Sequence, residues 1–217
     1  MRNVRGVVAV CLAMGAGSWS LSAQAQDTEG ALQLGLGTSV FSYSSASLEA
    51  EAQGVTQDLD ISTTRWGLSD TQATLELGYG LSDMIVLGGF AQLGGASTTT
   101  EIGATESEES SFSWVIGPKI DFMFSPGQTV RPFVGAALGL SSSSTEAGAA
   151  ETSTTALQLL GRVGIRAFLA DGFSLDPALT LGWASLLSGD LDLGVADADL
   201  SGSAFNIGVA VGFSGWL

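Results

Sequence analysis

Residues 112–124 read Phe-Ser-Trp-Val-Ile-Gly-Pro-Lys-Ile-Asp-Phe-Met-Phe, and this stretch decides the fold. One set of alternate positions is apolar and runs from Phe112 through Trp114 and Ile120 to Phe124, with Pro118 among them. The other set includes small and charged residues such as Gly117, and it also holds Lys119 and Asp121. A period of two indicates a β-strand with two unlike faces. The small, polar face suits a narrow barrel lumen, which predicts that the apolar face contacts lipid.

Seven further segments share this texture. Together the eight segments are 30–45, 69–80, 84–95, 110–124, 129–141, 154–169, 172–185 and 202–216. The chain is 45% hydrophobic, yet after residue 25 it contains no run of 18 apolar residues that could form a spanning helix. A closed barrel pairs every backbone group between strands. The sequence therefore predicts an all-β fold, an eight-stranded antiparallel transmembrane β-barrel of up-and-down topology, with a local bulge at Pro118.

The connections alternate between short and long. Short turns are expected at 81–83, 125–128 and 170–172, and long loops near 46–68, 96–109, 142–153 and 186–201. Outer-membrane barrels have short periplasmic turns and longer external loops, so both termini are expected on the periplasmic side. Aromatic residues near the predicted strand ends are expected to form two girdles at the membrane boundaries. The girdle residues near the short turns are Tyr79, Phe124, Phe173, Phe213 and Trp216, and those near the loops are Phe41, Tyr43, Trp66, Phe112, Trp114, Trp183 and Phe205.

Residues 1–25 are typical of a cleaved signal peptide. Arg2 and Arg5 precede an apolar stretch at 6–17, and Ala23-Gln24-Ala25 fits a signal-peptidase site. The expected division is a signal peptide at 1–25 and a barrel domain at 26–217, exported to the bacterial outer membrane.

The composition argues against several classes of function. The chain has no histidine, and its single cysteine, Cys11, lies in the expected signal peptide. Catalysis by a Ser-His-Asp or Cys-His site is therefore excluded, and a zinc or copper site is disfavoured. With 22 acidic residues against seven basic ones, nucleic acid is not an expected partner. The sequence predicts no cofactor and no enzyme.

Three phrases resemble one family: Gly78-Tyr79-Gly80-Leu81-Ser82-Asp83, Ile116-Gly117-Pro118-Lys119 and Arg131-Pro132-Phe133-Val134-Gly135. Through them the chain resembles the small OmpA/OmpX/OmpW-like outer-membrane β-barrel superfamily. The last segment is similar to the signal that the barrel-assembly machinery reads in such proteins, at Asn206, Gly208, Val211 and Phe213. The resemblance implies the assembly machinery, membrane lipid and lipopolysaccharide as partners. It does not imply an activity.

Alternation places seven charged residues in one inward-facing layer near the short turns: Glu76, Lys119, Asp121, Arg131, Arg162, Arg166 and Asp176. Eight strands leave a lumen barely wide enough for side chains, where unpaired charge is costly. We expect the pairs Asp121–Arg131 and Asp176–Arg166, and Glu76 with Arg162 or Lys119. The layer is interpreted as a structural plug, and a charged constriction that gates a narrow pore is the alternative.

The long loops are strongly acidic. They contain 15 of the 22 acidic residues: Glu49, Glu51, Asp58, Asp60, Asp70, Glu101, Glu106, Glu108, Glu109, Glu146, Glu151, Asp190, Asp192, Asp197 and Asp199. Solvation and repulsion of neighbours at the cell surface is the main interpretation. The alternative is weak Ca²⁺ or Mg²⁺ binding by Asp190, Asp192, Asp197 and Asp199, which lack a complete EF-hand loop.

The sequence thus predicts a structural or surface-interaction barrel with a charge-plugged lumen. A narrow porin-like channel for small solutes is the second hypothesis, and a membrane enzyme is a distant third. A conductance measurement separates the first two, and hydrolysis assays address the third. The sequence names no solute, partner protein or oligomeric state.

Overall fold

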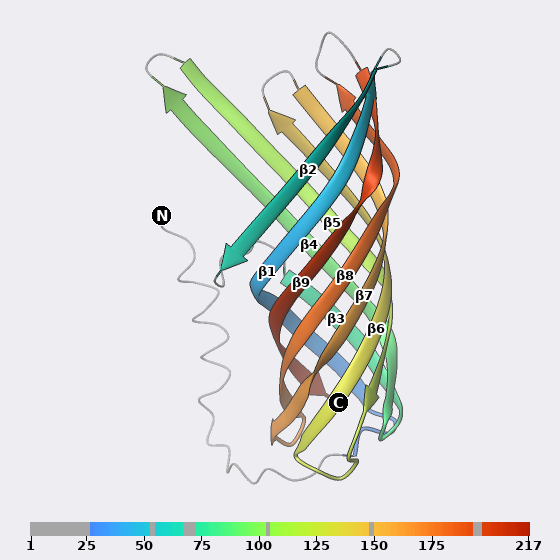
Figure 1. Ribbon diagram of the computed structural model, residues 1–217. Coiled ribbons are helices and arrows are strands. Elements are labelled where there is room, and N and C mark those ends of the chain that lie inside the picture. The colour runs from blue at the N-terminus through green and yellow to red at the C-terminus, as the bar shows by residue number, and fades with distance from the viewer. Residues whose placement is uncertain (1–26, 53–54, 67–72, 103–104, 148–149, 193–196) are drawn as a thin grey trace.

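The computed structural model describes residues 27–52, 55–66, 73–102, 105–147, 150–192 and 197–217, and these residues form an antiparallel sheet that curves into a barrel (Figure 1). The strands are β1 (Leu32–Ala52), β2 (Val55–Trp66), β3 (Ala73–Ser82), β4 (Ile85–Ile102), β5 (Thr105–Met123), β6 (Val130–Ala147), β7 (Ala150–Ala170), β8 (Phe173–Asp192) and β9 (Asp197–Trp216). The expected signal peptide and its cleavage site lie outside the described residues.

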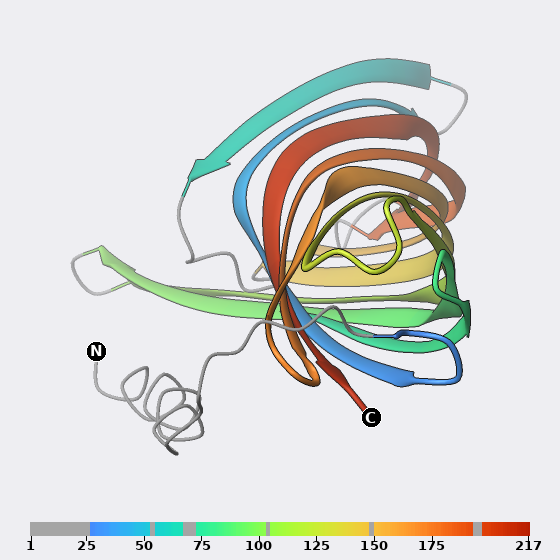
Figure 2. The same ribbon diagram turned by 90° about the horizontal axis from the view of Figure 1, so that it is seen from below.

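The ring closes through β1. One edge of β1 pairs with β9 from Gln33 to Glu51. Its other edge carries β3 along Leu32–Thr38 and then β2 along Phe41–Ala52. Because β2 and β3 follow one another on the same edge, the closed ring consists of β1 and β3–β9. β2 lies beside the upper part of β1 (Figure 1) and is the outermost strand on that side in the view from below (Figure 2). The ring therefore has the eight predicted strands and the antiparallel up-and-down order.

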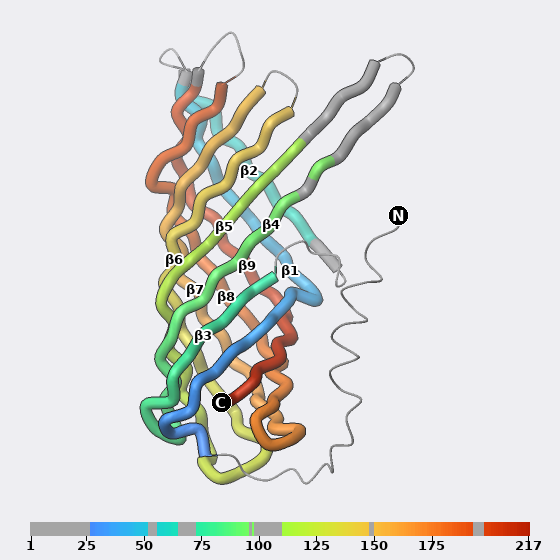
Figure 3. The backbone as a smooth tube through the Cα atoms, turned by 180° about the vertical axis from the view of Figure 1, so that it is seen from behind, coloured from blue at the N-terminus to red at the C-terminus, as the bar shows by residue number. Residues whose placement is uncertain are grey.

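Among the described residues, the wall is continuous only in its lower part. The ladder between β3 and β4 ends at the pair Ala73–Leu93. Beyond it, within the described residues, β4 pairs only with β5 and β2 pairs only with β1. The β4–β5 hairpin accordingly leans away from the barrel axis (Figures 1 and 3).

The outer surface of the lower wall is apolar. Large exposed apolar side chains occupy alternate positions, as on β3, where Leu75, Leu77, Tyr79 and Leu81 point outward. On β6 the outward band ends at Leu140 and serines follow. On β6 and β9 the band spans 130–140 and 205–213, which fits the roughly 9–11 residues of a tilted membrane strand. In the described part of the chain, no helix is long and apolar enough to cross a membrane.

The expected long loops are wrong in their extent. Strands continue through most of 46–68, 96–109, 142–153 and 186–201, so that β1 and β7 each reach 21 residues. The loop prediction failed because apolar alternation marks only the part of a strand that faces lipid. The continuing segments are rich in Ser and Thr, and Thr favours strands without making either face apolar.

The expected bulge at Pro118 is also wrong. The register with β4 is unbroken across it, and the ladder with β6 keeps the same register on both sides, from Ile116–Leu140 to Lys119–Ala137. Only the pairs at Gly117 and Pro118 are missing from that ladder, because proline has no N–H to donate.

Both described ends of the chain lie at the end of the barrel that carries the short turns, called the turn end below; the opposite end is the hairpin end. The backbone N–H of Leu32 donates to the carbonyl of Leu217 over 2.8 Å, and Leu217 donates back over 2.9 Å. Two of the turns use glycines with positive φ, Gly127 at 79° and Gly172 at 76°.

The missing β5–β6 pairs give one prediction. A Cβ added at Gly117 would lie 1.8 Å from the carbonyl oxygen of Leu138, so Gly117→Ala forces the two strands apart. We expect a loss of about 1–3 kcal/mol, seen as a lower urea midpoint of the protein refolded in lipid vesicles. The control is Gly161→Ala, whose nearest contact would be 3.9 Å away. Equal midpoints for the two variants would contradict the close approach.

Candidate functional site

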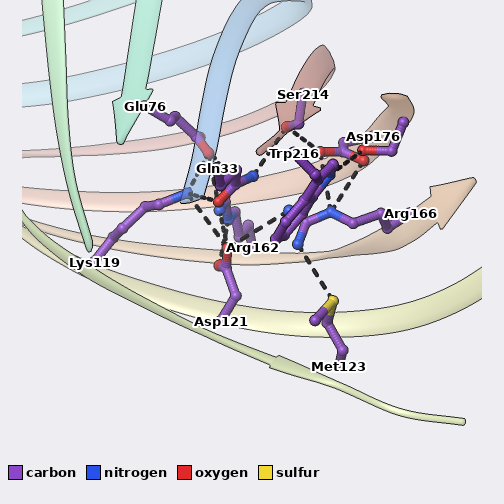
Figure 4. Close-up of polar contacts among 11 residues, drawn as sticks. Gln33, Glu76, Lys119, Asp121, Met123, Arg162, Arg166, Asp176, Ser214 and Trp216 are labelled. Atoms are coloured by element: carbon purple, nitrogen blue, oxygen red, sulfur yellow. Dashed lines mark hydrogen bonds and ion pairs between the residues drawn. The ribbon is translucent and has the colours of Figure 1, made fainter. Parts of the chain in front are cut away.

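A layer of charged side chains crosses the lumen near the turn end (Figure 4). Glu76 comes from β3, Lys119 and Asp121 from β5, Arg162 and Arg166 from β7, and Asp176 from β8. All lie on the inward face, since each occupies the alternate position to the lipid-facing residues. The structure thus brings together six of the seven charged residues that the sequence assigns to this layer.

The centre of the layer is a four-residue network. Arg162 donates from Nε to Asp121 Oδ1 over 2.9 Å, and its other guanidinium nitrogens donate to Glu76 and Asp121. The Lys119 ammonium donates to Glu76 and, over 3.1 Å, to Gln33 Oε1. Glu76 therefore contacts both of the cations proposed for it from the sequence. Each carboxylate is shared between two cations, so each charge has a partner of opposite sign.

A second group continues the layer toward β9. Arg166 donates from Nε to both oxygens of Asp176 over 3.1 Å, which is the expected Asp176–Arg166 pair. Ser214 donates to Asp176 over 2.8 Å and accepts from the Gln33 amide over 2.9 Å. Arg166 Nη2 lies 3.7 Å from Asp121 Oδ2 and joins the two groups.

Arg131 does not form the expected pair with Asp121. The β5–β6 register sets Asp121 opposite Gly135, four residues from Arg131. Arg131 instead lies nearer the turn end, where its Nη1 is 4.0 Å from the Asp83 carboxylate and its Nε donates to the carbonyl of Gln128 over 3.0 Å. The prediction assumed that the two residues are equally distant from the turn, and the register shows that they are not.

Aromatic side chains fill the lumen below the charges. The Arg131 guanidinium lies 5.0 Å from the Phe168 ring centre, and Arg166 lies 4.9 Å from that of Trp216. The Phe133 ring lies 5.3 Å from Arg162 and 5.2 Å from Arg166. Both Arg131 and Arg166 are fully buried. These distances are those of cation–π contacts, which stabilise cations away from water.

Sequence reasoning missed these aromatic residues. Trp216 was assigned to the lipid-facing girdle, but it is only 4% exposed and its Nε1 donates to the Ser174 hydroxyl over 3.2 Å. Trp216 alternates in step with the inward positions Gly212 and Ser214 on β9. The alternation alone therefore could have predicted that Trp216 points into the lumen. On β6 the same alternation places Phe133 on the inward face together with Arg131.

The residues before β1 cover the turn end of the lumen. Thr28 is fully buried, and the backbone N–H of Gly30 donates to the Gly80 carbonyl over 2.8 Å. The backbone N–H of Thr28 donates to Asp83 Oδ1 over 2.9 Å, and this hydrogen bond holds the pKa of Asp83 below its usual value.

A cavity of about 400 Å³ lies on the hairpin side of the charge layer. Glu76, Lys119, Arg162 and Asp176 line its base, and residues of the upper lumen line its walls. The lumen is therefore filled at the turn end and hollow above it.

The acidic residues expected in loops lie mostly on strands and face one another. Asp190 is opposite Asp199, and Asp192 is opposite Asp197, in the β8–β9 hairpin. Glu49 is likewise opposite Asp58 in the β1–β2 hairpin. Among the described residues, no group of three or more carboxylates is arranged to hold a metal ion.

The residues that resemble the assembly signal lie on β9 between β8 and β1. Asn206, Gly208, Val211 and Phe213 are all among the residues that line the lumen cavity, and the Phe213 side chain is also exposed on the outer surface.

The opposed carboxylates give a second prediction. Like charges directly opposite one another weaken a strand pair by roughly 0.2–1 kcal/mol. Glu49→Gln should therefore slow amide hydrogen exchange in β2, and the difference from the unaltered protein should shrink as NaCl is added. The control is Asp60→Asn. Asp60 is opposite Ser47, so this substitution removes no repulsion between directly opposed charges. Unchanged exchange in Glu49→Gln at low salt would contradict the repulsion.

Comparisons with known proteins place this geometry in a family. The model for the outer membrane protein beta-barrel domain matches residues 9–213. No curated protein matches the chain. The solved structure of the outer membrane protein OprG from Pseudomonas aeruginosa matches with 12% identity over 85% of this chain and 96% of that chain, at a TM-score of 0.56.

Two other solved barrels match with lower TM-scores. Neisserial surface protein A matches with 14% identity over 86% of this chain and 99% of that chain, at a TM-score of 0.43. The N-terminal β-barrel domain of Pseudomonas aeruginosa OprF matches with 13% identity over 87% of this chain and 99% of that chain, at a TM-score of 0.42. At these identities the structural matches bear on the fold alone, whereas the family model covers most of the chain. The chain belongs to the outer membrane protein beta-barrel domain family, whose members are barrels of the Gram-negative outer membrane.

Proposed function

We propose that the chain is a non-conducting outer-membrane barrel with a structural or surface-interaction role. Its turn end would face the periplasm and its acidic hairpins the cell exterior. The observation that supports this most is the layer of paired charges with the arginine–aromatic stack beneath it. A pore needs a continuous hydrated path, and here fully buried side chains of Arg131, Phe133 and Arg166 occupy the lumen below the charges.

The charges also argue for a fixed plug over a gate. Removing one partner of a buried pair leaves an uncompensated charge, which costs about 3–5 kcal/mol. Arg162 bridges Glu76 and Asp121, so opening the layer would break several such contacts together. A layer that opened readily would need at least one weakly held cation.

Conductance decides between a plug and a channel. The protein refolded in a planar lipid bilayer should show no stepwise current, and vesicles that contain it should not swell in small sugars. Stepwise current from the unaltered protein that changes with Arg162→Ala would establish the alternative, a narrow channel gated by this layer.

Stability gives an independent prediction. Arg166→Ala removes the cation that holds Asp176 and packs against Trp216, so the unfolding temperature should fall clearly while conductance stays absent. Conductance should stay absent because Arg131, Phe168 and Trp216 still fill the turn end. The control is Asp171→Ala in the exposed β7–β8 turn, which should leave both readings unchanged. A conducting Arg166→Ala barrel would show that the layer alone seals the lumen.

The acidic hairpins supply the surface-interaction part of the proposal. Opposed carboxylates such as Asp190 and Asp199 favour cations in their surroundings, including Ca²⁺ or Mg²⁺ near lipopolysaccharide. If an ion site exists there, Ca²⁺ should slow hydrogen exchange near 190–199 more than NaCl at matched ionic strength. Equal protection by both salts would mean screening alone.

Catalysis is left out of the proposal. The E. coli outer membrane protease OmpT matches in structure at 10% identity with a TM-score of 0.43, which supports no activity for this chain. Hydrolysis of lipid or peptide substrates by the refolded protein would contradict this part.

A further inference from the structure

The cavity above the charge layer is encoded by residue size. On β6 the inward side chains shrink from Arg131 and Phe133 at the turn end to Gly135, Ala137 and Gly139 above them. On β9 they shrink from Trp216 to Gly212, Ala210 and Gly208. The same two strands therefore fill the lumen at one end and leave it open at the other. The resulting volume of about 400 Å³ lies in the range of small-molecule sites, about 300–1,000 Å³.

The lining of this cavity mixes apolar and polar side chains. Phe90 on β4, Val115 on β5 and Leu160 on β7 are apolar. Hydroxyl and amide groups come from several strands, and they include Ser42, Ser44, Gln92, Gln158, Thr180 and Asn206. A ligand that fills the cavity must therefore present both apolar groups and hydroxyl or amide groups.

The charges at the base are already satisfied. Glu76 and Arg162 are paired with each other, and Asp176 is held by Arg166 and Ser214. A charged ligand would find no unpaired counter-charge there and would lose its hydration. By contrast, in the part of the chain that the structure describes, the amides of Gln158 and Asn206 have no hydrogen-bond partner. Each amide can both donate and accept a hydrogen bond.

We infer that this cavity binds a neutral saccharide of one or two rings. The hydroxyl groups of such a molecule both donate and accept, which matches free amides and hydroxyls. The C–H faces of its rings are apolar and can contact Leu160, which lines the cavity and is only partly buried. The ligand enters from the hairpin end, since the turn end is filled. This binding goes beyond the proposed function and does not depend on whether the layer below conducts.

Binding is measured on the full protein refolded in phosphocholine micelles, because sugar-based detergents would compete. The probe is sucrose, titrated by calorimetry and by saturation-transfer NMR, with glucuronate and glucosamine as charged comparators. We expect saturable binding of sucrose and at least about tenfold weaker binding of either charged sugar, a difference of about 1.4 kcal/mol.

Two variants test the location. Ala137→Phe fills the cavity, and its control, Ala91→Phe, adds the same ring at an outward position on β4 that does not line the cavity. Gln158→Leu removes a free amide, and Gln57→Leu makes the same change on exposed β2. The cavity variants should weaken sucrose binding at least about tenfold and the controls should not. Heat-modified migration on SDS gels verifies that each variant is folded.

Each contrary result overturns the inference. Absence of saturable binding to the unaltered protein removes the site. Equal binding by Ala137→Phe and Ala91→Phe means that sucrose associates elsewhere. Equal or tighter binding of a charged sugar removes the neutral class of ligand.

Discussion

The sharing of Arg162 between Glu76 and Asp121 is the interaction on which the rest of the lumen depends. Three strands, β3, β5 and β7, contribute one charge each, and Arg162 could not be buried without the two carboxylates. Lys119 and Arg166 extend the same network, so that it reaches β8 through Asp176. Because the partners lie on different strands, the network forms only when the sheet has closed in the correct register.

The register also explains the unlike contents of the lumen. A slip by one residue would turn every charge toward lipid, and a slip by two would keep the faces but separate Glu76 from Arg162. Closure in the correct register therefore fixes both the charge layer and the cavity above it. The outer face tolerates more change, since any apolar side chain at an outward position such as Leu77 satisfies the lipid.

Much of the fold could be predicted from the sequence because alternation with a period of two is a local property. The inward orientation of Glu76, Lys119 and Asp176 follows from it directly. The pairing of Asp121 could not be predicted, since it depends on the stagger between β5 and β6. The alternation pattern within either strand does not reveal that stagger. The length of the hairpins was missed because alternation disappears once both faces meet water. Trp216 was assigned to the wrong face, although the alternation along β9 indicates an inward position, because an aromatic residue near a strand end suggested a girdle.

The discontinuity in the wall between β2 and β4 has a consequence for depth. Within the described residues, the β3–β4 ladder ends at Leu93, which is also the last large exposed apolar residue among the β4 side chains that the structure describes. Unpaired N–H and C=O groups each cost several kcal/mol in hydrocarbon but can hydrogen-bond to water above it. Among the described residues, the end of this ladder therefore coincides with the outer limit of the apolar surface on that side of the barrel. A thicker bilayer would bring the described part of β4 that pairs only with β5 into contact with lipid, so the strand pairing limits the bilayer thickness that suits the protein.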